Sequence, residues 1–267
     1  MNMTEMQISD PQAHLVANEG DILDELLHLK GSTVLELGCG KAEKTRIVAE
    51  KAASVLALEV DETQLARNLA ITDLPNVRFA HGGAEKIPAA DSNFDIVLMF
   101  KSLHHVPGEL MDSVFSEIRR VLKPGGVAYI SEPVYAGDFN EVLKLFHDEK
   151  AVREAAFAAE QRAVSSGRLA LVSQKFFMQP MHFADFGQFE QQVLKVTHTE
   201  HRLSCRDPGK STLEVQRLYD PGWSDFSDAD ACRPVQKIRP VNKSGPEDGN
   251  VTAETHSLCG HDVIFAA

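Results

Sequence analysis

The chain has 267 residues and a formal net charge of −12. This length is enough to bury one sizeable core, and the acidity disfavours a broad attraction to the phosphates of nucleic acids. No apolar run approaches the roughly 18 residues that span a bilayer, so no membrane partner is expected. Cysteines at positions 39, 205, 232 and 259 lack Cys-x-x-Cys spacing, and the N-terminus lacks a signal-peptide pattern, which predicts a cytoplasmic protein with free thiols.

The first element expected is a helix that begins at Asp10 and Pro11 and continues to about residue 29. Asp10 suits the N-cap, and Pro11 suits the first helical position. The apolar residues of this segment keep roughly helical spacing. Gly20 marks the place where the helix would break in two.

A short apolar strand, Val34–Leu37, is followed by a turn made of Gly38, Cys39 and Gly40. Glycine has no Cβ, so its backbone can adopt positive φ and approach a ligand closely. The free N–H groups at the start of the next helix point toward such a ligand. The turn therefore predicts a nucleoside site, although a lone Gly-x-Gly is also compatible with an ordinary strand-to-helix turn.

A second apolar run over residues 54–58 ends at Glu59, which lies 21 positions after Gly38. A carboxylate at that spacing fits one that accepts hydrogen bonds from a ribose diol. Glu43 stands where the dinucleotide fingerprint has its third glycine, and its charge would repel a pyrophosphate at a helix N-terminus. The two motifs together favour a nucleoside without phosphates over NAD.

Strands and helices continue to alternate after this point. The pattern predicts helices over 43–52, 62–72 and 109–122 and strands over 77–80, 94–100 and 127–131. Such alternation predicts an α/β fold with a doubly wound, mostly parallel sheet. Ligands of open parallel sheets bind beyond the carboxyl ends of the strands, so residues 100–105 are expected to face the site.

Five motifs, in this order, resemble those of the class I S-adenosylmethionine-dependent methyltransferases of the small-molecule type. They are Val-Leu-Glu-Leu-Gly-Cys-Gly at 34–40, Leu-Glu-Val-Asp at 58–61, Phe-Asp-Ile-Val at 94–97, Leu-His-His-Val-Pro at 103–107 and Leu-Lys-Pro-Gly-Gly at 122–126. The resemblance covers roughly residues 20–135 and implies a seven-stranded Rossmann-like methyltransferase fold with S-adenosyl-L-methionine as cofactor. The cofactor-binding residues that it implies are Glu36, Gly38, Cys39, Gly40, Glu59, Val60, Ala84, Glu85, Phe100 and His105.

The sequence departs from the family pattern at two positions. A carboxylate aligned with Gly83 often binds the adenine amino group in the family, and this chain lacks it. Glu85 or the backbone of Ala84 would have to substitute. Ala42 is the second departure, and the two together keep open a non-catalytic binding protein on the same fold.

Methyl transfer from a sulfonium is an in-line displacement, so the protein mainly has to orient donor and acceptor and exclude water. A general base is needed only if the acceptor arrives protonated. His105 and His104 are the catalytic candidates, because they follow a strand end and histidine titrates near neutral pH. A structural role at the cofactor mouth is the alternative. No His, Cys and carboxylate cluster has metal-ligand spacing, so no metal is expected.

Beyond Pro133 the family pattern fades, and the remaining chain is expected to complete one domain over 1–242. A helical lid over about 138–201 would supply the substrate pocket. Within it we expect one long or broken helix over 138–166 that ends at Gly167, an aromatic stretch at 176–183 and a helix over about 185–196. The aromatic stretch is either a pocket wall or a strand or loop that fills the core. A last helix after Pro208, a strand over 235–241 and a flexible tail over 243–267 complete the prediction.

The function predicted is methyl transfer to a small-molecule acceptor by in-line displacement. A non-catalytic S-adenosylmethionine-binding protein is the alternative, and a nucleotide-dependent oxidoreductase is disfavoured by Glu43. The sequence identifies neither the acceptor, nor the atom that is methylated, nor the oligomeric state.

Overall fold

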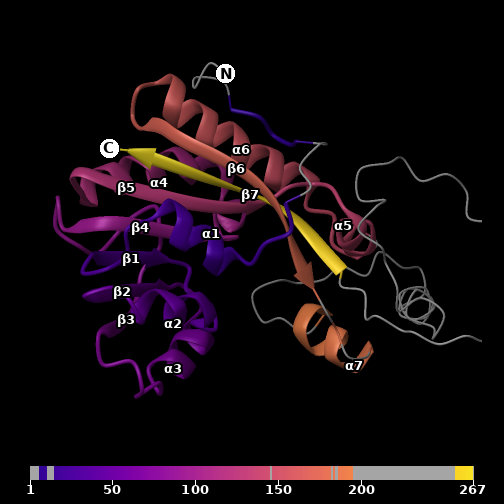
Figure 1. The fold of residues 1–267 in the computed structure, drawn as a ribbon, viewed down its shortest axis with the longest axis horizontal. Coiled ribbons are helices and arrows are strands. Elements are labelled where there is room, and N and C mark those ends of the chain that lie inside the picture. Colours follow the sequence, from indigo (N-terminus) through magenta and orange to yellow (C-terminus); the bar gives the residue numbers. More distant parts are fainter. Residues whose placement is uncertain are drawn as a thin grey trace, which may run out of the picture. The chain divides into compact units, whose positions relative to one another are not determined.

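The computed structural model describes residues 6–10, 15–144, 146–181, 183, 186–194 and 256–266. The chain divides into two compact units (Figure 1). The first unit contains residues 1–135, 149–178 and 259–267, and the second contains 136–148 and 179–258. No helix in the described ranges is both long and apolar enough to cross a membrane.

A seven-stranded sheet in the order β3-β2-β1-β4-β5-β7-β6 forms the centre of the first unit. Strands β3, β2, β1, β4 and β5 pair in parallel, and β7 is antiparallel to β5. This confirms the predicted doubly wound, mostly parallel sheet. The strands are β1 (Thr33–Leu37), β2 (Ser54–Glu59), β3 (Val77–His81), β4 (Phe94–Phe100), β5 (Leu122–Pro133), β6 (Ala170–Met181) and β7 (His256–Ala266).

Helices cover both faces of this sheet. They are α1 (Glu19–Leu26), α2 (Glu43–Ala49), α3 (Glu62–Asn68), α4 (Met111–Val121) and α6 (Lys150–Ser165), with 3-10 turns η1 (Leu103–His105) and η2 (Gly108–Leu110). Alternate residues of a strand face opposite sides, so a sheet with two covered faces needs nearly continuous apolar strands. Leu35 and Val97 pack in one cluster with side chains of α4 and α6. Val34 and Leu98 pack in the other with side chains of α1 and α2.

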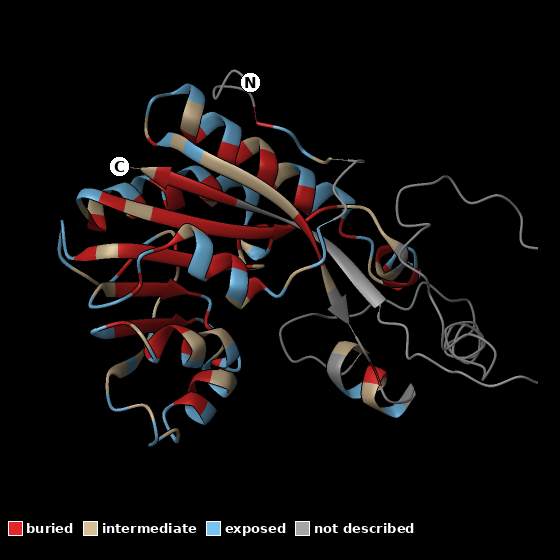
Figure 2. Ribbon diagram, viewed as in Figure 1, coloured by how far each residue is buried: buried red, intermediate tan, exposed pale blue. Residues whose placement is uncertain are grey.

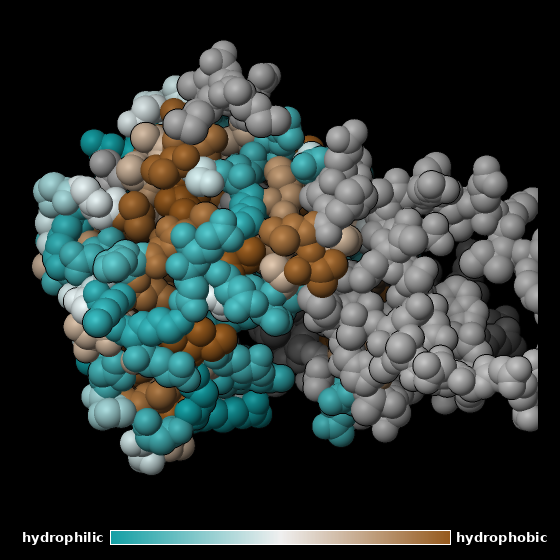
Figure 3. Space-filling model, in the orientation of Figure 1, coloured by the Kyte–Doolittle hydropathy of each residue, from teal (hydrophilic) through white to brown (hydrophobic). Residues whose placement is uncertain are grey.

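The burial pattern agrees with this two-faced sheet. Buried residues run along the strands, while exposed residues lie on the outer sides of the helices (Figure 2). On the face shown in Figure 3, hydrophilic side chains cover much of the surface around α2 and α3, as the strongly acidic composition leads one to expect.

The N-terminal helix is shorter than predicted. It begins at Glu19 and not at Asp10, and Gly20 lies inside it rather than breaking it. Residues 15–17 pair instead with β6: the Met178 N–H donates to the Leu15 carbonyl at 2.7 Å, and the Ala17 N–H donates to the Met178 carbonyl at 3.1 Å. This tertiary pairing satisfies the backbone and overrides the helical spacing of the side chains. Residues 11–14 lie outside the described ranges.

The region predicted as a lid, residues 138–201, contributes to both units. The predicted long helix is broken into α5 (Asp138–Leu143) and α6, and Gly167, at φ +68°, ends α6 as expected. The next element, β6, belongs to the main sheet, and its Phe177 and Met178 are buried. Of the two alternatives predicted for the aromatic stretch, Phe177 and Met178 therefore fit a core strand and not a pocket wall.

The prediction of a flexible C-terminal tail is wrong for residues 256–266. Residues 256–266 form β7, in which Val263 pairs with Ile130 and the run from Val263 to Phe265 is buried. An apolar run this short becomes a strand because β5 supplies its hydrogen bonds and apolar neighbours, which the local sequence does not show. The helix predicted after Pro208 and the strand over 235–241 lie outside the described residues.

The second unit contains a small aromatic cluster of its own. It is built on α5 and α7 (Phe186–Phe189), with a π-helical turn over Glu190–Leu194. Phe183 and Phe189 pack edge to face with their ring centroids 5.4 Å apart, and Phe146 packs edge to face on Phe189 at 6.4 Å. These Phe residues of the predicted lid region pack against one another. The lid stays a prediction.

Candidate cofactor and catalytic site

The carboxyl ends of the five parallel strands lie along one edge of the sheet. The neighbours β1 and β4 are the switch point of the strand order, because β2 and β3 extend the sheet to one side and β5 to the other. Ligands of doubly wound sheets bind at this point. The glycine turn after β1, Glu59 at the end of β2 and the turn η1 after β4 all belong to this edge.

The glycine turn is held from two sides. The Gly38 and Cys39 N–H groups both donate to the Leu58 carbonyl at 3.0 Å, and the buried Asn68 amide donates to the Gly40 carbonyl at 2.8 Å. Gly38 and Gly40 have φ of +73° and +50°, as a sharp turn requires, and Ala42 also has positive φ, at +61°.

The two glycines have different surroundings. A Cβ on Gly38 would lie 2.9 Å from the Cβ of Ser102, whereas a Cβ on Gly40 would meet no atom within 4 Å. Space therefore lies open in front of Gly40. Cys39, between them, is buried, and burial raises the pKa of its thiol, so its side chain belongs to the core rather than to the ligand side.

Glu59 binds the turn from the end of β2. Its Oε2 accepts the Gly40 N–H at 2.8 Å, and its Oε1 accepts the N–H groups of Val60 at 2.9 Å and Asp61 at 3.0 Å. A carboxylate offers about four acceptor positions, so about one remains for a ligand. Val60, beside it, is 59% exposed and presents an apolar surface.

Glu36 lies in β1, fully buried behind the glycine turn. Burial, followed by the charges of Glu19 and Glu59, raises the pKa of its carboxyl from 4.5 to about 7, although Thr45 and Lys44 act in the opposite direction. Its Oε2 has no hydrogen-bond partner. A neutral carboxyl is therefore the stable form of Glu36 in the ligand-free fold below neutral pH.

Replacing Glu36 by Gln is expected to remove a pH dependence of the stability. The unfolded chain ionises Glu36 above pH 4.5 while the folded chain keeps the proton up to about pH 7, so the wild-type free energy of unfolding falls by roughly 3 kcal/mol over this window. The variant lacks this fall and should exceed the wild type in stability at pH 8. Urea unfolding at pH 5, 6, 7 and 8 measures it, with the exposed Glu43→Gln as control. Equal slopes in Glu36→Gln and wild type would contradict the assignment.

The loop after β3 carries the adenine candidates. A Cβ on Gly83 would lie 2.3 Å from Glu85 Oε2, so the Glu85 carboxylate occupies the space in which a side chain at position 83 would begin. Ala84, between them, is buried. Glu85 and the backbone of Ala84 both stay predictions for the recognition of adenine.

Arg120 of α4 fixes the continuation of this loop. Its guanidinium donates to the carbonyls of Ile87 at 3.0 Å and Ala89 at 2.8 Å. Glu117, one turn earlier, pairs with Arg120 and accepts the Ile87 N–H at 2.8 Å. Several charge-assisted hydrogen bonds thus hold the loop to a helix of the core.

Phe100 does not contribute its side chain to the site. The ring packs on Tyr129 with centroids 5.7 Å apart, within the core cluster on the α1 side of the sheet. The prediction of Phe100 as a cofactor residue can therefore refer only to its backbone at the end of β4. The apolar run to which it belongs fills the core, as a central strand does.

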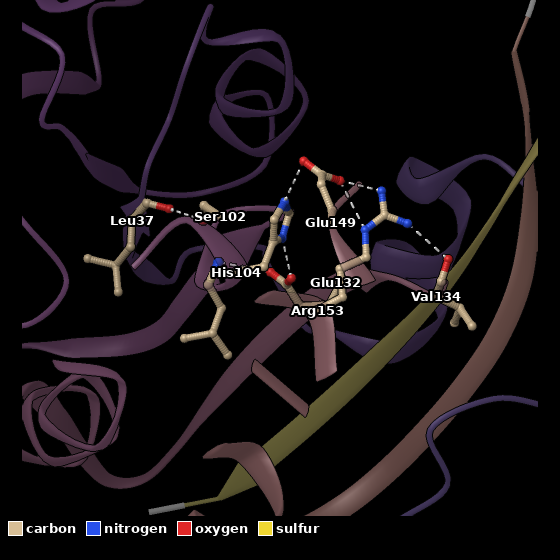
Figure 4. A network of polar contacts seen from close by, with 8 residues as sticks. Leu37, Ser102, His104, Glu132, Val134, Glu149 and Arg153 are labelled. Carbon is tan, nitrogen blue, oxygen red and sulfur yellow. Dashed lines mark hydrogen bonds and ion pairs between the residues drawn. The ribbon is translucent and has the colours of Figure 1, made fainter. Parts of the chain in front are cut away.

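The two histidines occupy different environments. His105 is exposed, whereas His104 is buried and lies between two carboxylates (Figure 4). The His104 Nδ1–H donates to Glu132 Oε2 at 2.5 Å, and Nε2 lies 3.9 Å from Glu149 Oε1. Burial lowers the pKa of His104, but the charges of Glu132 and Glu149 and the hydrogen bond to Glu132 outweigh it, so the pKa lies above 6.5. Both ring nitrogens of His104 face a carboxylate in the buried interior, so the ring is not open to an acceptor, which leaves the exposed His105 as the candidate base.

The sequence pointed to some of the residues that shape the site and not to others. Ser102 lies in the segment 100–105 that was expected to face the site, and Glu132 directly follows the predicted strand 127–131. Asn68, Arg120 and Arg153 carried no signal, because their partners are distant in the chain. In the described part of the chain, no group of three or more His, Cys, Asp or Glu residues could hold a metal ion.

The chain is similar to known methyltransferases over the residues that carry this site. Residues 35–130 match the family model of a methyltransferase domain. A protein of Mycolicibacterium smegmatis named as a probable S-adenosylmethionine-dependent methyltransferase is 35% identical over 103 residues, 39% of this chain and 38% of that protein. A demethylmenaquinone methyltransferase of Staphylococcus epidermidis is 36% identical over 107 residues, 39% of this chain and 44% of that protein.

A solved structure shows the same fold. The YcgJ protein of Bacillus subtilis has a TM-score of 0.53 at 15% identity, over 92% of this chain and 95% of that one. The chain spans less than half the length of the two curated relatives named above. The matched domain contains the glycine turn, Glu59 and both histidines. Over this domain the chain resembles the S-adenosylmethionine-dependent methyltransferases.

Proposed function

We propose that this protein is a methyltransferase that transfers a methyl group from S-adenosyl-L-methionine to a small-molecule acceptor by in-line displacement. The observation that carries the proposal is the glycine turn, with open space in front of Gly40 and the Glu59 carboxylate beside it. A nucleoside fits such a place, because open space at the glycine turn and a carboxylate that can accept a ribose hydroxyl lie together.

The chain's residues divide the binding of the cofactor among them. Gly38 and Gly40 would allow the backbone to approach the amino-acid part, with Glu36 buried behind them. Glu59 would accept a hydrogen bond from the ribose, with Val60 as an apolar neighbour. Glu85 or the backbone of Ala84 would bind the adenine amino group. Gly-x-Gly alone is weak evidence, and the proposal rests on these groups meeting at one edge of the sheet.

The cofactor brings an electrophilic methyl group and its own leaving group. The protein therefore has to hold donor and acceptor in line and to exclude water. An acceptor that arrives protonated would give its proton to a base within hydrogen-bond reach. His105 is our candidate for that base, since its ring is exposed at the edge of the sheet, while His104 holds its own proton between carboxylates.

A small molecule is the acceptor class we favour. One relative is named for demethylmenaquinone, and the net charge of −12 disfavours nucleic acid as the substrate. The cytoplasmic location remains a prediction from the cysteine pattern.

Thermal unfolding with S-adenosylhomocysteine or with NADH tests the cofactor assignment. A ligand at 100 times its Kd stabilises the native state by about 2.7 kcal/mol, which should raise Tm by about 5 °C or more. We expect this rise with S-adenosylhomocysteine and none with NADH. The reverse would identify an oxidoreductase. Binding without methyl transfer to any quinol, phenol, amine or thiol acceptor would instead identify a non-catalytic binding protein.

A further inference from the structure

We propose that Glu149 and Arg153, at the start of α6, are positioning residues that fix the segment 102–105 at the catalytic edge through the ring of His104. The inference rests on the proposed function, in which this segment borders the acceptor. Neither residue belongs to the matched methyltransferase domain, which ends at residue 130. Four buried side chains carry the inference: His104, Glu132, Glu149 and Arg153 (Figure 4).

Glu132 connects the segment to β5. Its Oε1 accepts the Leu103 N–H at 2.9 Å, and its Oε2 accepts His104 Nδ1–H at 2.5 Å. Glu132 is 3% exposed and His104 5% exposed, so water does not compete for these contacts. Two charge-assisted bonds from one carboxylate fix both the backbone and the ring of η1.

Glu149 and Arg153 connect the other side of the ring to α6. Glu149 Oε1 lies 3.9 Å from His104 Nε2, while its Oε2 accepts Arg153 Nε–H at 3.0 Å and Nη2–H at 2.5 Å. Arg153 Nη1–H donates to the Val134 carbonyl at 3.1 Å, just beyond β5. The start of α6 is thereby joined both to η1 and to the residue that follows β5.

The charges of these four groups balance only when His104 is protonated. Two carboxylates then face one imidazolium and one guanidinium. Removal of one member leaves an uncompensated charge in a dry interior, which is strongly destabilising, whereas removal of an oppositely charged pair leaves the remainder balanced. A single and a double variant of these residues can therefore separate an effect on stability from an effect on the position of the segment 102–105.

The segment that the network holds also touches both parts of the proposed site. Ser102 Oγ–H donates to the Leu37 carbonyl at 3.0 Å, directly before the glycine turn. The exposed ring of His105 lies against the His104 ring, with centroids 4.1 Å apart. A movement of His104 would therefore displace the candidate base, whereas the bond from Ser102 to Leu37 holds the other end of the segment at the glycine turn.

The test uses the full chain with Glu149→Gln, the double variant Glu149→Gln/Arg153→Gln and the matched control Glu154→Gln. Glu154 lies on the same helix but is exposed, where it pairs with Lys150. The double variant keeps the interior balanced and should recover most of the stability that the single variant loses. NMR titration of the His104 and His105 ring protons, Kd for S-adenosylhomocysteine and kcat are measured for each.

We expect the double variant to remain folded, with a lowered His104 pKa, shifted His105 ring signals and kcat reduced roughly tenfold or more, since misplacement of reacting groups by about 1 Å can cost about 10²-fold. Kd for S-adenosylhomocysteine should change less than twofold, and Glu154→Gln should match the wild type throughout. A double variant with wild-type His105 signals and kcat would overturn the inference, because a merely structural pair would be repaired by the second substitution. The NMR readouts need no turnover, so they decide the inference even if the methyltransferase activity itself is not found.

Discussion

Glu59→Ala is expected to weaken the binding of S-adenosylhomocysteine at least tenfold. The carboxylate has about one acceptor position left for a ribose hydroxyl, and a hydrogen bond to a charged group is worth roughly 1.5–3 kcal/mol. Isothermal titration calorimetry measures the change, with Glu62→Ala, an exposed acidic residue in the first turn of α3, as control. Equal affinity in Glu59→Ala and wild type would rule out the ribose assignment.

The same substitution should also lower the stability of the ligand-free protein. The N–H groups of Gly40, Val60 and Asp61 all lose their acceptor, and an unpaired buried donor costs roughly 1–3 kcal/mol, with part-buried ones at the low end. Glu59 thus holds the turn together, in addition to the ribose contact that we propose for it. A lower midpoint in urea for Glu59→Ala than for Glu62→Ala would distinguish the two roles.

The parts of the fold that the sequence predicted well have local causes. Strands β1, β2 and β4 are short apolar runs bounded by turns. The glycines after β1 adopt positive φ, as a sharp turn requires. Helix α1 was extended too far because residues 15–17 have helical spacing yet pair with β6. The strand β7 was missed because its partner β5 lies more than 120 residues earlier in the chain.

The residues of the candidate site also divide into those that the local sequence predicts and those that it does not. The spacing of Gly38, Gly40 and Glu59 was recognisable, since residues that bind one nucleoside follow the ends of neighbouring strands at a characteristic spacing. The role of His104 was not, because its protonation depends on Glu132 and Glu149, which are 28 and 45 positions away. The topology of the sheet brings these side chains together at one edge. Their spacing along the chain does not show that they are neighbours.

Gly38 and Gly40, which the sequence treats as equivalent, are expected to respond differently to the same substitution. Gly38→Ala should lower the free energy of unfolding by roughly 2–5 kcal/mol, because positive φ costs an L-residue roughly 1–2 kcal/mol and overpacking adds roughly 1–3 kcal/mol. Its Cβ would lie 2.9 Å from the Cβ of Ser102. Gly40→Ala carries only the backbone cost, because its Cβ enters open space. It should stay folded and lose cofactor affinity, since that space is where we place the ligand.

The double variant Gly38→Ala/Ser102→Gly isolates the steric part of this difference. It removes the Ser102 Cβ and also the hydroxyl that donates to the Leu37 carbonyl at 3.0 Å. A double-mutant cycle in urea should therefore show a favourable coupling, in which the pair loses less stability than the sum of the two single variants. Calorimetry with S-adenosylhomocysteine should find binding lost in Gly40→Ala, although that variant loses only the roughly 1–2 kcal/mol of the backbone cost. Equal stability of Gly38→Ala and Gly40→Ala would contradict the crowding of Gly38 against Ser102. Wild-type affinity of Gly40→Ala for the ligand would contradict the placement of the cofactor in the open space beside Gly40.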